Sequence, residues 1–174
     1  IDALCATGDD VIAALPCYFN HQMWLTIRGI TPRYLSLNPE TAIPDPAEVD
    51  ALVSDKTKAI LLVSPNNPTG ATYSPECIEQ FYQLAKKHNI ALIVDETYRD
   101  FHSRPGAPHA LFSDPDWHDT LIHLYSFSKA YRLTGQRVGA RVASPARLAE
   151  VEKFLDTVTI CPNQLGQHAA LWGM

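Results

Sequence analysis

A lysine and two serines follow an apolar segment, residues 120–125, that is typical of a buried strand. The serines are Ser126 and Ser128, the lysine is Lys129, and Arg137 comes shortly afterwards. A lysine amine, once neutral, forms and exchanges imines with carbonyl groups. Hydroxyl and guanidinium groups are suitable donors to phosphate. The pattern predicts that Lys129 carries a cofactor aldehyde as a Schiff base, while Ser126, Ser128 and Arg137 hold the cofactor's phosphate.

Polar residues also follow two other apolar segments. Asn67 lies in a turn rich in Pro, Asn and Gly after residues 59–64, and Asp95 ends residues 91–94, with Tyr98 close behind. Each has a structural alternative: an Asn between prolines is a common turn former, Asp95 could cap a helix, and Tyr98 could be a core aromatic. Lys129 and Arg137 could likewise be solvated surface residues. Only their combination points to chemistry.

The elements that must position these residues alternate between strands and helices. Short apolar segments predict strands at residues 11–15, 31–37, 59–64, 91–94, 120–125 and 139–143. Helices are expected near residues 22–28, 46–53, 75–87 and from 145 onwards. Continuous apolar strands that alternate with helices are typical of an α/β fold, with a mostly parallel sheet and helices on both faces. In such sheets ligands bind beyond the carboxyl ends of the strands, where Asn67, Asp95 and Lys129 are expected to meet.

Two segments contain signals for the end or the start of a helix. Ser74 is a suitable N-cap for a helix that begins at Pro75, whose apolar residues recur at helical spacing (Ile78, Phe81, Tyr82 and Ala85). Residues 1–6 resemble the end of a helix that Gly8 would close. With this beginning and the apolar pattern at residues 171–174, we interpret the chain as a segment of a longer protein.

Composition excludes several functional classes. The chain has 174 residues, 46% of them hydrophobic, and a net charge of −5, which favours one globular domain. Without a run of Lys and Arg, we expect no binding of nucleic acid or of an anionic membrane surface. The seven histidines lack metal-ligand spacing, so no metal site is expected. The four scattered cysteines favour reduced thiols and a cytoplasmic location. No apolar stretch reaches the roughly 20 residues that span a bilayer, and no signal peptide is visible.

Taken together, these motifs resemble the class I/II aminotransferases, pyridoxal-phosphate enzymes of the aspartate aminotransferase fold (fold type I). The resemblance covers nearly the whole chain in order. It lies in Ser64-Pro65-Asn66-Asn67-Pro68-Thr69-Gly70, Asp95-Glu96-Thr97-Tyr98, Ser126-Phe127-Ser128-Lys129 and Arg137-Val138-Gly139. Upstream, Gly8-Asp9-Asp10-Val11-Ile12 and Pro16-Cys17-Tyr18 are similar to the family's first strand and its Pro-x-aromatic turn.

The resemblance implies a role for the catalytic lysine and for the residues around the cofactor ring. Lys129 would form the internal aldimine and then carry the proton between the substrate α-carbon and the cofactor C4′. Asp95 would pair with the pyridine nitrogen and keep it protonated, which makes the ring an electron sink. Tyr98 and Asn67 would hydrogen-bond the phenolic oxygen. Tyr18 would stack on the ring, although the neighbouring Phe19 is an alternative for that place.

The resemblance also implies how the chain relates to a complete enzyme. Residues 1–174 would be an incomplete cofactor-binding large domain, with a phosphate loop expected upstream and a substrate-binding small domain downstream. The complete protein would bind pyridoxal 5′-phosphate and transfer an amino group from an amino acid to a 2-oxo acid, as a homodimer. Two alternatives stay open: a C–S lyase or β-eliminase on the same fold, and a regulatory domain that senses the cofactor without catalysis.

Overall fold

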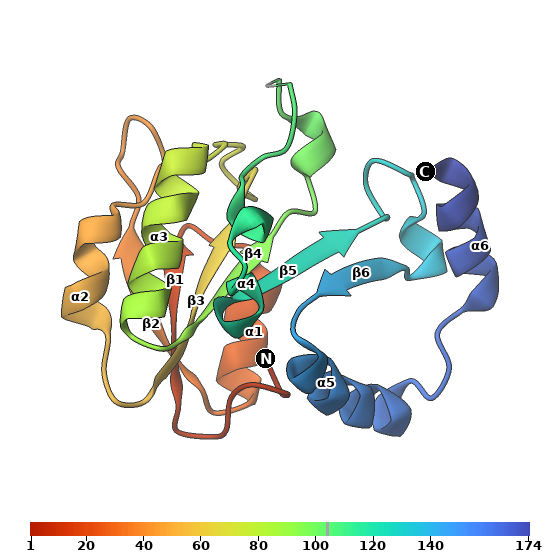
Figure 1. Ribbon diagram of the computed structural model, residues 1–174, viewed down its shortest axis with the longest axis horizontal. Coiled ribbons are helices and arrows are strands. Elements are labelled where there is room, and N and C mark those ends of the chain that lie inside the picture. The colour runs from red at the N-terminus through yellow and green to blue at the C-terminus, as the bar shows by residue number, and fades with distance from the viewer. Residues whose placement is uncertain (104) are drawn as a thin grey trace.

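Six strands form a single sheet in the order β2-β1-β3-β4-β5-β6 in the computed structural model, which describes residues 1–103 and 105–174 (Figure 1). The neighbouring strands run parallel except for β6, which is antiparallel to β5. The strands are β1 (Asp10–Leu15), β2 (Thr31–Ser36), β3 (Thr57–Val63), β4 (Ala91–Asp95), β5 (Leu121–Ser126) and β6 (Gly139–Val142). The prediction of a mostly parallel α/β sheet is therefore confirmed.

Helices cover both faces of this sheet, as predicted. One face is covered by α2 (Val49–Leu52), α3 (Pro75–Lys87) and α4 (Trp117–Thr120), and the other by α1 (Phe19–Ile27) and α5 (Pro145–Val158). At the C-terminal side, α6 (Gln164–Gly173) lies beyond β6. We call the two faces the α3 face and the α1 face.

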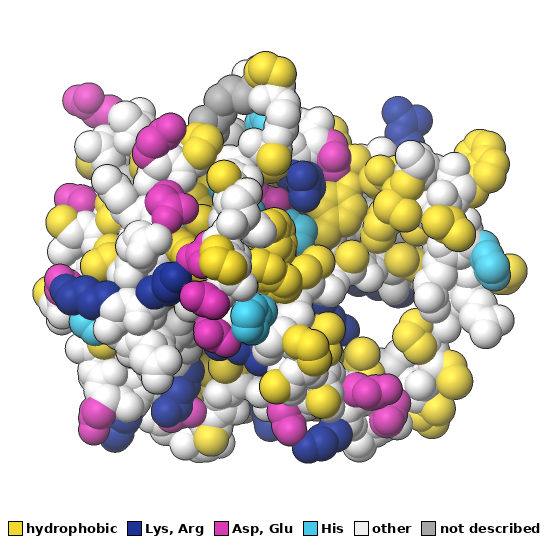
Figure 2. All heavy atoms as spheres, viewed as in Figure 1, with side chains coloured by type: hydrophobic (Ala, Val, Ile, Leu, Met, Phe, Trp, Pro, Cys, Tyr) yellow, Lys and Arg dark blue, Asp and Glu magenta, His cyan; other side chains and the backbone are white. Residues whose placement is uncertain are grey.

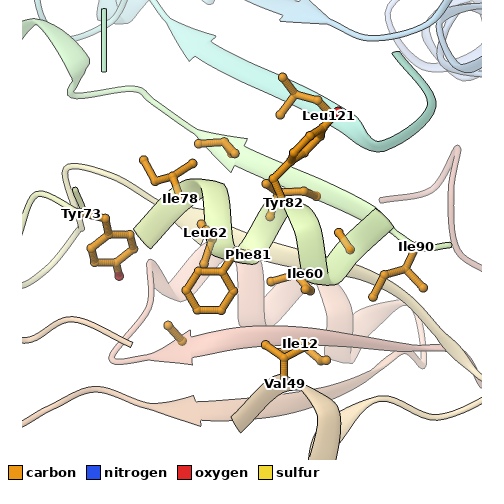
Figure 3. Packing of buried hydrophobic residues seen from close by; sticks show 14 of the residues in the cluster. Ile12, Val49, Ile60, Leu62, Tyr73, Ile78, Phe81, Tyr82, Ile90 and Leu121 are labelled. Carbon is orange, nitrogen blue, oxygen red and sulfur yellow. The ribbon is translucent and has the colours of Figure 1, made fainter. Parts of the chain in front are cut away.

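Alternating side chains along the strands build one hydrophobic cluster on each face. In β4, Leu92 and Val94 belong to the cluster on the α3 face, whereas Ala91 and Ile93 belong to that on the α1 face. Figure 3 shows Phe81 of α3 directed at the strands, near Ile60 and Leu62. A strand buried on both faces needs apolar residues at every position, which explains the continuous apolar segments of the sequence.

The sequence of α3 contains its own start signal. Ser74 Oγ accepts a hydrogen bond from the Cys77 backbone N–H at 3.1 Å, and Pro75 occupies the first turn. The residues predicted to share one face, Ile78 and Phe81 among them, are buried. Both the N-cap and the buried face of this helix are confirmed.

The connection from β5 to β6 reverses the chain direction. Residues 127–138 contain only the short 3-10 helix η4 (Thr134–Gln136) and return the chain alongside β5. Glycine is needed where β6 begins, because a Cβ at Gly139 would lie 2.8 Å from the Tyr125 carbonyl oxygen. This reversal places Arg137 beside the residues that follow β5.

Two other parts of the chain differ from expectation. The helical end predicted for residues 1–6 is wrong: the segment makes a single turn in which the Leu4 and Cys5 N–H groups donate to the Ile1 carbonyl. Its apolar side chains pack against the α1-face cluster, so their spacing reflects burial of a turn. The helix expected at residues 22–28 begins earlier, at Phe19. Among residues 1–103 and 105–174, no helix has the length and apolarity needed to cross a bilayer.

Candidate active site

One cavity of about 390 Å³ lies where β3, β4 and β5 end. Its lining includes every site residue predicted from the sequence: Tyr18, Asn67, Asp95, Tyr98, Ser126, Ser128, Lys129 and Arg137. The parallel order of the three strands brings their carboxyl ends to one edge, although the residues are distant in the chain. The expected meeting of the strand ends is confirmed, while the chemical roles of the residues stay predictions.

Asp95 ends β4 as a nearly buried carboxylate with two protein partners. Its Oδ1 accepts hydrogen bonds from Thr97 Oγ1 at 2.7 Å and from the Thr97 backbone N–H at 3.1 Å. Its Oδ2 lies 3.2 Å from Nε2 of His21 on α1. Burial acts to raise the pKa of Asp95, but the bonds from His21 and Thr97 outweigh it and hold the pKa below its ordinary value. Asp95 is therefore ionised at neutral pH and suited to a cationic ligand atom.

Lys129 lies in the turn that follows β5 and is exposed to the cavity opening. Its backbone carbonyl accepts from the Arg132 N–H, and the Ser128 N–H donates to Ser126 Oγ at 3.2 Å. The ammonium Nζ lies 5.8 Å from the centre of the Tyr98 ring. The amine is thus held between two strand ends and can be reached by a ligand.

Arg137 closes the opposite side of the cavity. Its Nη1 donates to the Thr134 carbonyl at 2.9 Å and to Ser128 Oγ at 3.4 Å. Its backbone is left-handed, with φ of 54°, a conformation that non-glycine residues adopt uncommonly and often at functional sites. A guanidinium fixed through Nη1 keeps Nη2 and Nε available for an anion, with the hydroxyls of Ser126 and Ser128 nearby.

Aromatic and amide groups complete the wall. The Tyr18 hydroxyl accepts a hydrogen bond from Asn20 Nδ2 at 2.8 Å, and its ring meets the His21 ring edge to face at 5.4 Å. Phe19, the alternative stacking residue, is 60% exposed and does not line the cavity, so the geometry favours Tyr18. Asn67 and Tyr98 stand at the rim, where they also line a neighbouring groove.

The structure adds three residues that the sequence did not indicate. Thr97 and Thr134 line the cavity, and His21 contacts Asp95. Thr97 could have been found, because the backbone N–H two residues after an Asp often donates to its carboxylate, as the Thr97 N–H does to Asp95. His21 had no sequence signal: its helix was expected to begin later, and only the packing of α1 on the sheet brings it to Asp95.

These donor groups fit pyridoxal 5′-phosphate. An amine for an aldehyde, a buried ionised carboxylate for a pyridinium nitrogen, and a guanidinium with two hydroxyls for a phosphate lie around one cavity. The fit rests on the chemistry of these groups and on their shared cavity.

Comparison with known proteins also points to the aminotransferases. The family model "Aminotransferase class I and II" matches residues 1–172. The aspartate aminotransferase of Thermotoga maritima is 34% identical over 173 residues, which are 97% of this chain and 45% of that protein. The alanine aminotransferase of Mycobacterium tuberculosis is 34% identical over 177 residues, 97% of this chain and 41% of that protein. The chain thus spans a little under half the length of these curated relatives.

Two solved structures are also similar to this chain. Aspartate aminotransferase from Thermus thermophilus with maleate superimposes with a TM-score of 0.90 at 27% identity, covering 98% of this chain and 44% of that one. An Escherichia coli protein whose crystal structure identified a methionine aminotransferase function gives 0.89 at 27% identity, covering 97% and 45%. Relatives with the same fold are therefore named as aminotransferases of different amino acids, aspartate and methionine among them.

Proposed function

The chain belongs to the aminotransferase class I and II family, a family of transferase enzymes, and from this premise we propose the activity of the whole protein. The protein moves an amino group from an amino acid to a 2-oxo acid with pyridoxal 5′-phosphate as cofactor. The observation that carries this proposal is the meeting of Lys129, Asp95 and Arg137 around one cavity at the strand ends. The proposal includes a homodimer in the cytoplasm. Sedimentation of the full-length protein would test the dimer.

Lys129 is the proposed catalytic residue. When bound, pyridoxal phosphate supplies an electron sink for the bonds at the substrate α-carbon. Lys129 Nζ would hold the cofactor through its aldehyde, and the freed amine would serve as the base and acid that moves the α-proton of the substrate. An exposed lysine in a turn can make this exchange, because the amine moves without disturbing the sheet.

Asp95 keeps the ring nitrogen of the cofactor protonated. Its carboxylate is ionised because His21 and Thr97 donate to it, and it is buried enough that water competes weakly. A carboxylate beside a protonated ring nitrogen stabilises the charge of both groups. His21 and Thr97 hold the two oxygens of Asp95 in place and so orient it.

The remaining residues bind and orient. Arg137, Ser126 and Ser128 bind the phosphate, with the guanidinium held in place by the Thr134 carbonyl. Tyr98 and Asn67, at the rim, would donate to the phenolic oxygen of the ring. Tyr18 would stack on the ring and exclude water from it.

The experiment is a half-reaction with the full-length protein. Protein loaded with cofactor is mixed with single amino acids, and the absorbance of the cofactor is followed as it changes to the pyridoxamine form. We expect conversion with at least one donor, and reversal on addition of a 2-oxo acid. Release of pyruvate and ammonia without transfer would indicate the lyase alternative, and cofactor binding without either reaction would indicate a regulatory domain.

A further inference from the structure

Glu96 follows Asp95 directly, yet its side chain lies on the opposite face of the sheet. Side chains alternate along a strand, so Asp95 continues the row on the α1 face and Glu96 continues that on the α3 face. Glu96 is only 1% exposed. Burying a carboxylate costs free energy unless the charge is paired, so a buried Glu96 requires partners within the protein.

Three basic side chains from three elements surround Glu96. Nε2 of His123, on β5, lies 2.8 Å from Oε2, Nη1 of Arg99 lies 3.5 Å from Oε2, and Nε2 of His109 lies 3.4 Å from Oε1. The Phe112 ring packs against both histidine rings at 5.8 Å and closes the group on the α3 face.

His109 contributes as a neutral ring. Its Nδ1 accepts from the Leu111 backbone N–H at 3.3 Å, so the proton of the neutral ring is on Nε2, which lies 3.4 Å from Glu96 Oε1 without a hydrogen bond between the two atoms. Burial lowers the pKa of His109 more than the Glu96 carboxylate raises it. The permanent positive charge beside Glu96 therefore comes from Arg99, while His123 supplies the 2.8 Å contact.

Glu96 also begins the turn that faces the cofactor cavity. The Arg99 N–H donates to the Glu96 carbonyl at 3.0 Å, which makes Thr97 and Tyr98 the two central residues of a turn. The Glu96 N–H donates to the Leu124 carbonyl at 2.9 Å, which ties the turn to β5. Both central residues line the cavity. The ends of the turn are thus joined twice, by the backbone bond and by the Glu96–Arg99 ion pair.

We propose that Glu96 is a positioning residue for the cofactor site. Its carboxylate, bonded to His123 and paired with Arg99 on the α3 face, fixes the turn that presents Thr97 and Tyr98 to the cavity. Glu96→Gln keeps the shape of the side chain but removes the charge that joins the ends of the turn. The inference rests on the proposed function for the identity of the ligand, whereas the fixing of the turn by Glu96 does not depend on that function.

The first test measures affinity for pyridoxal phosphate in the full-length protein. We expect Glu96→Gln to weaken binding about tenfold, whereas the exposed control Glu152→Gln leaves it unchanged. In a Tyr98→Phe background the same Glu96→Gln change should weaken binding by a smaller factor, because part of its effect passes through Tyr98. An equal loss in both backgrounds, or no loss in the single variant, would overturn the proposal.

The second test needs no cofactor. Amide hydrogen exchange of the cofactor-free protein should show residues 96–101 exchanging about tenfold faster in Glu96→Gln, with the other strands unchanged. Unaltered exchange there would contradict the proposal even if the wild type proved to bind no cofactor, so the two proposals fail separately. If Glu96→Gln does not fold, Arg99→Gln, which removes the cation at the other end of the turn, is measured in its place with the same expectation.

Discussion

The two ends of the strand order, the part around β1–β4 and the part around β6, differ greatly in how tightly they are packed. The packed part, which we define as β1–β4 with α2 and α3, buries most of its strand residues and contains Phe81 and Ile60 with no exposed area. The open part, defined as β6, α5 and α6, has every residue of β6 exposed and no buried residue in α5. Figure 2 shows hydrophobic side chains on the surface over α5 and α6. Phe154 is 37% exposed there, and Trp172 is 91% exposed.

This difference shows how the site is assembled. Asp95 ends β4 and Asn67 lies in the turn that follows β3, both in the packed part, whose strands are held by the core. Lys129 and Arg137 lie on the connection from β5 to β6, which borders the open part. The packed part therefore holds Asp95 and Asn67 at the cavity, while the connection carries Lys129 and Arg137, whose amine and guanidinium we propose as the groups for the cofactor's aldehyde and phosphate. Apolar surface of this kind marks contact sites with other protein segments.

Replacement of Lys129 should have the largest effect. Lys129→Ala removes the amine that moves the proton, so we expect kcat of the full-length protein to fall by at least about 10²–10⁴-fold. The thermal midpoint should be unchanged, because the exposed side chain packs against no core. Lys58→Ala, at the other end of the sheet, is the matched control. Retained transamination in Lys129→Ala would remove the basis of the account.

The contrast in packing can be measured with one pair of phenylalanines. Phe81→Ala should lower the free energy of unfolding of the chain by about 3–5 kcal/mol, because it leaves a cavity in the α3-face cluster. Phe154→Ala, in the open part, should cost under about 1 kcal/mol. Denaturant unfolding followed by circular dichroism measures both. Equal costs would show that the open part is as well packed as the rest.

Arg137→Lys should give an intermediate effect at the border of the open part. The charge is kept, but the planar fork and its bond to the Thr134 carbonyl are lost. Loss of charge-assisted bonds predicts about 10–100-fold weaker binding of pyridoxal phosphate, with weaker binding of inorganic phosphate as a competitor. Affinity for pyridoxal, which has no phosphate, should hardly change. Equal losses for both ligands would mean that Arg137 does not bind the phosphate.

Asp95 predicts an acid dependence of stability that comes from the packed part. Its pKa is lower in the folded chain than its ordinary value of 3.8, so its stabilising contribution is complete above that value. The contribution is lost as the pH falls through the lower, folded pKa. Asp95→Asn should therefore reduce the loss of stability on acidification below pH 3.8. Identical acid unfolding profiles for variant and wild type would contradict the inferred hydrogen bonds to the carboxylate.

The smallest expected effect compares the same cap in both parts. Ser74 and Ser144 each cap a helix whose first residue is proline, with Oγ bonds of 3.1 and 3.3 Å to backbone N–H groups. Ser74→Ala should lower the global free energy of unfolding by about 1 kcal/mol, because α3 unfolds with the core. Ser144→Ala should mainly speed local hydrogen exchange in α5. The reverse pattern would mean that α5 is the more firmly integrated helix.

The sequence was most informative where burial imposes a simple pattern. Apolar segments located the strands, and the parallel order implied that Asn67, Asp95 and Lys129 would meet. The sequence was uninformative where tertiary packing determines which side chains come into contact. His21 reaches Asp95 only through the placement of α1, and the group around Glu96 assembles from a strand and a distant loop. Neither set has a spacing that marks it. The exposure of α5 was also hidden, because its apolar spacing matches that of a buried helix.

The most direct measurement is reduction of the cofactor-loaded full-length protein with borohydride, followed by peptide mapping. The account predicts one phosphopyridoxyl group, attached to Lys129 Nζ. A label on another lysine, or no covalent label at all, would contradict it.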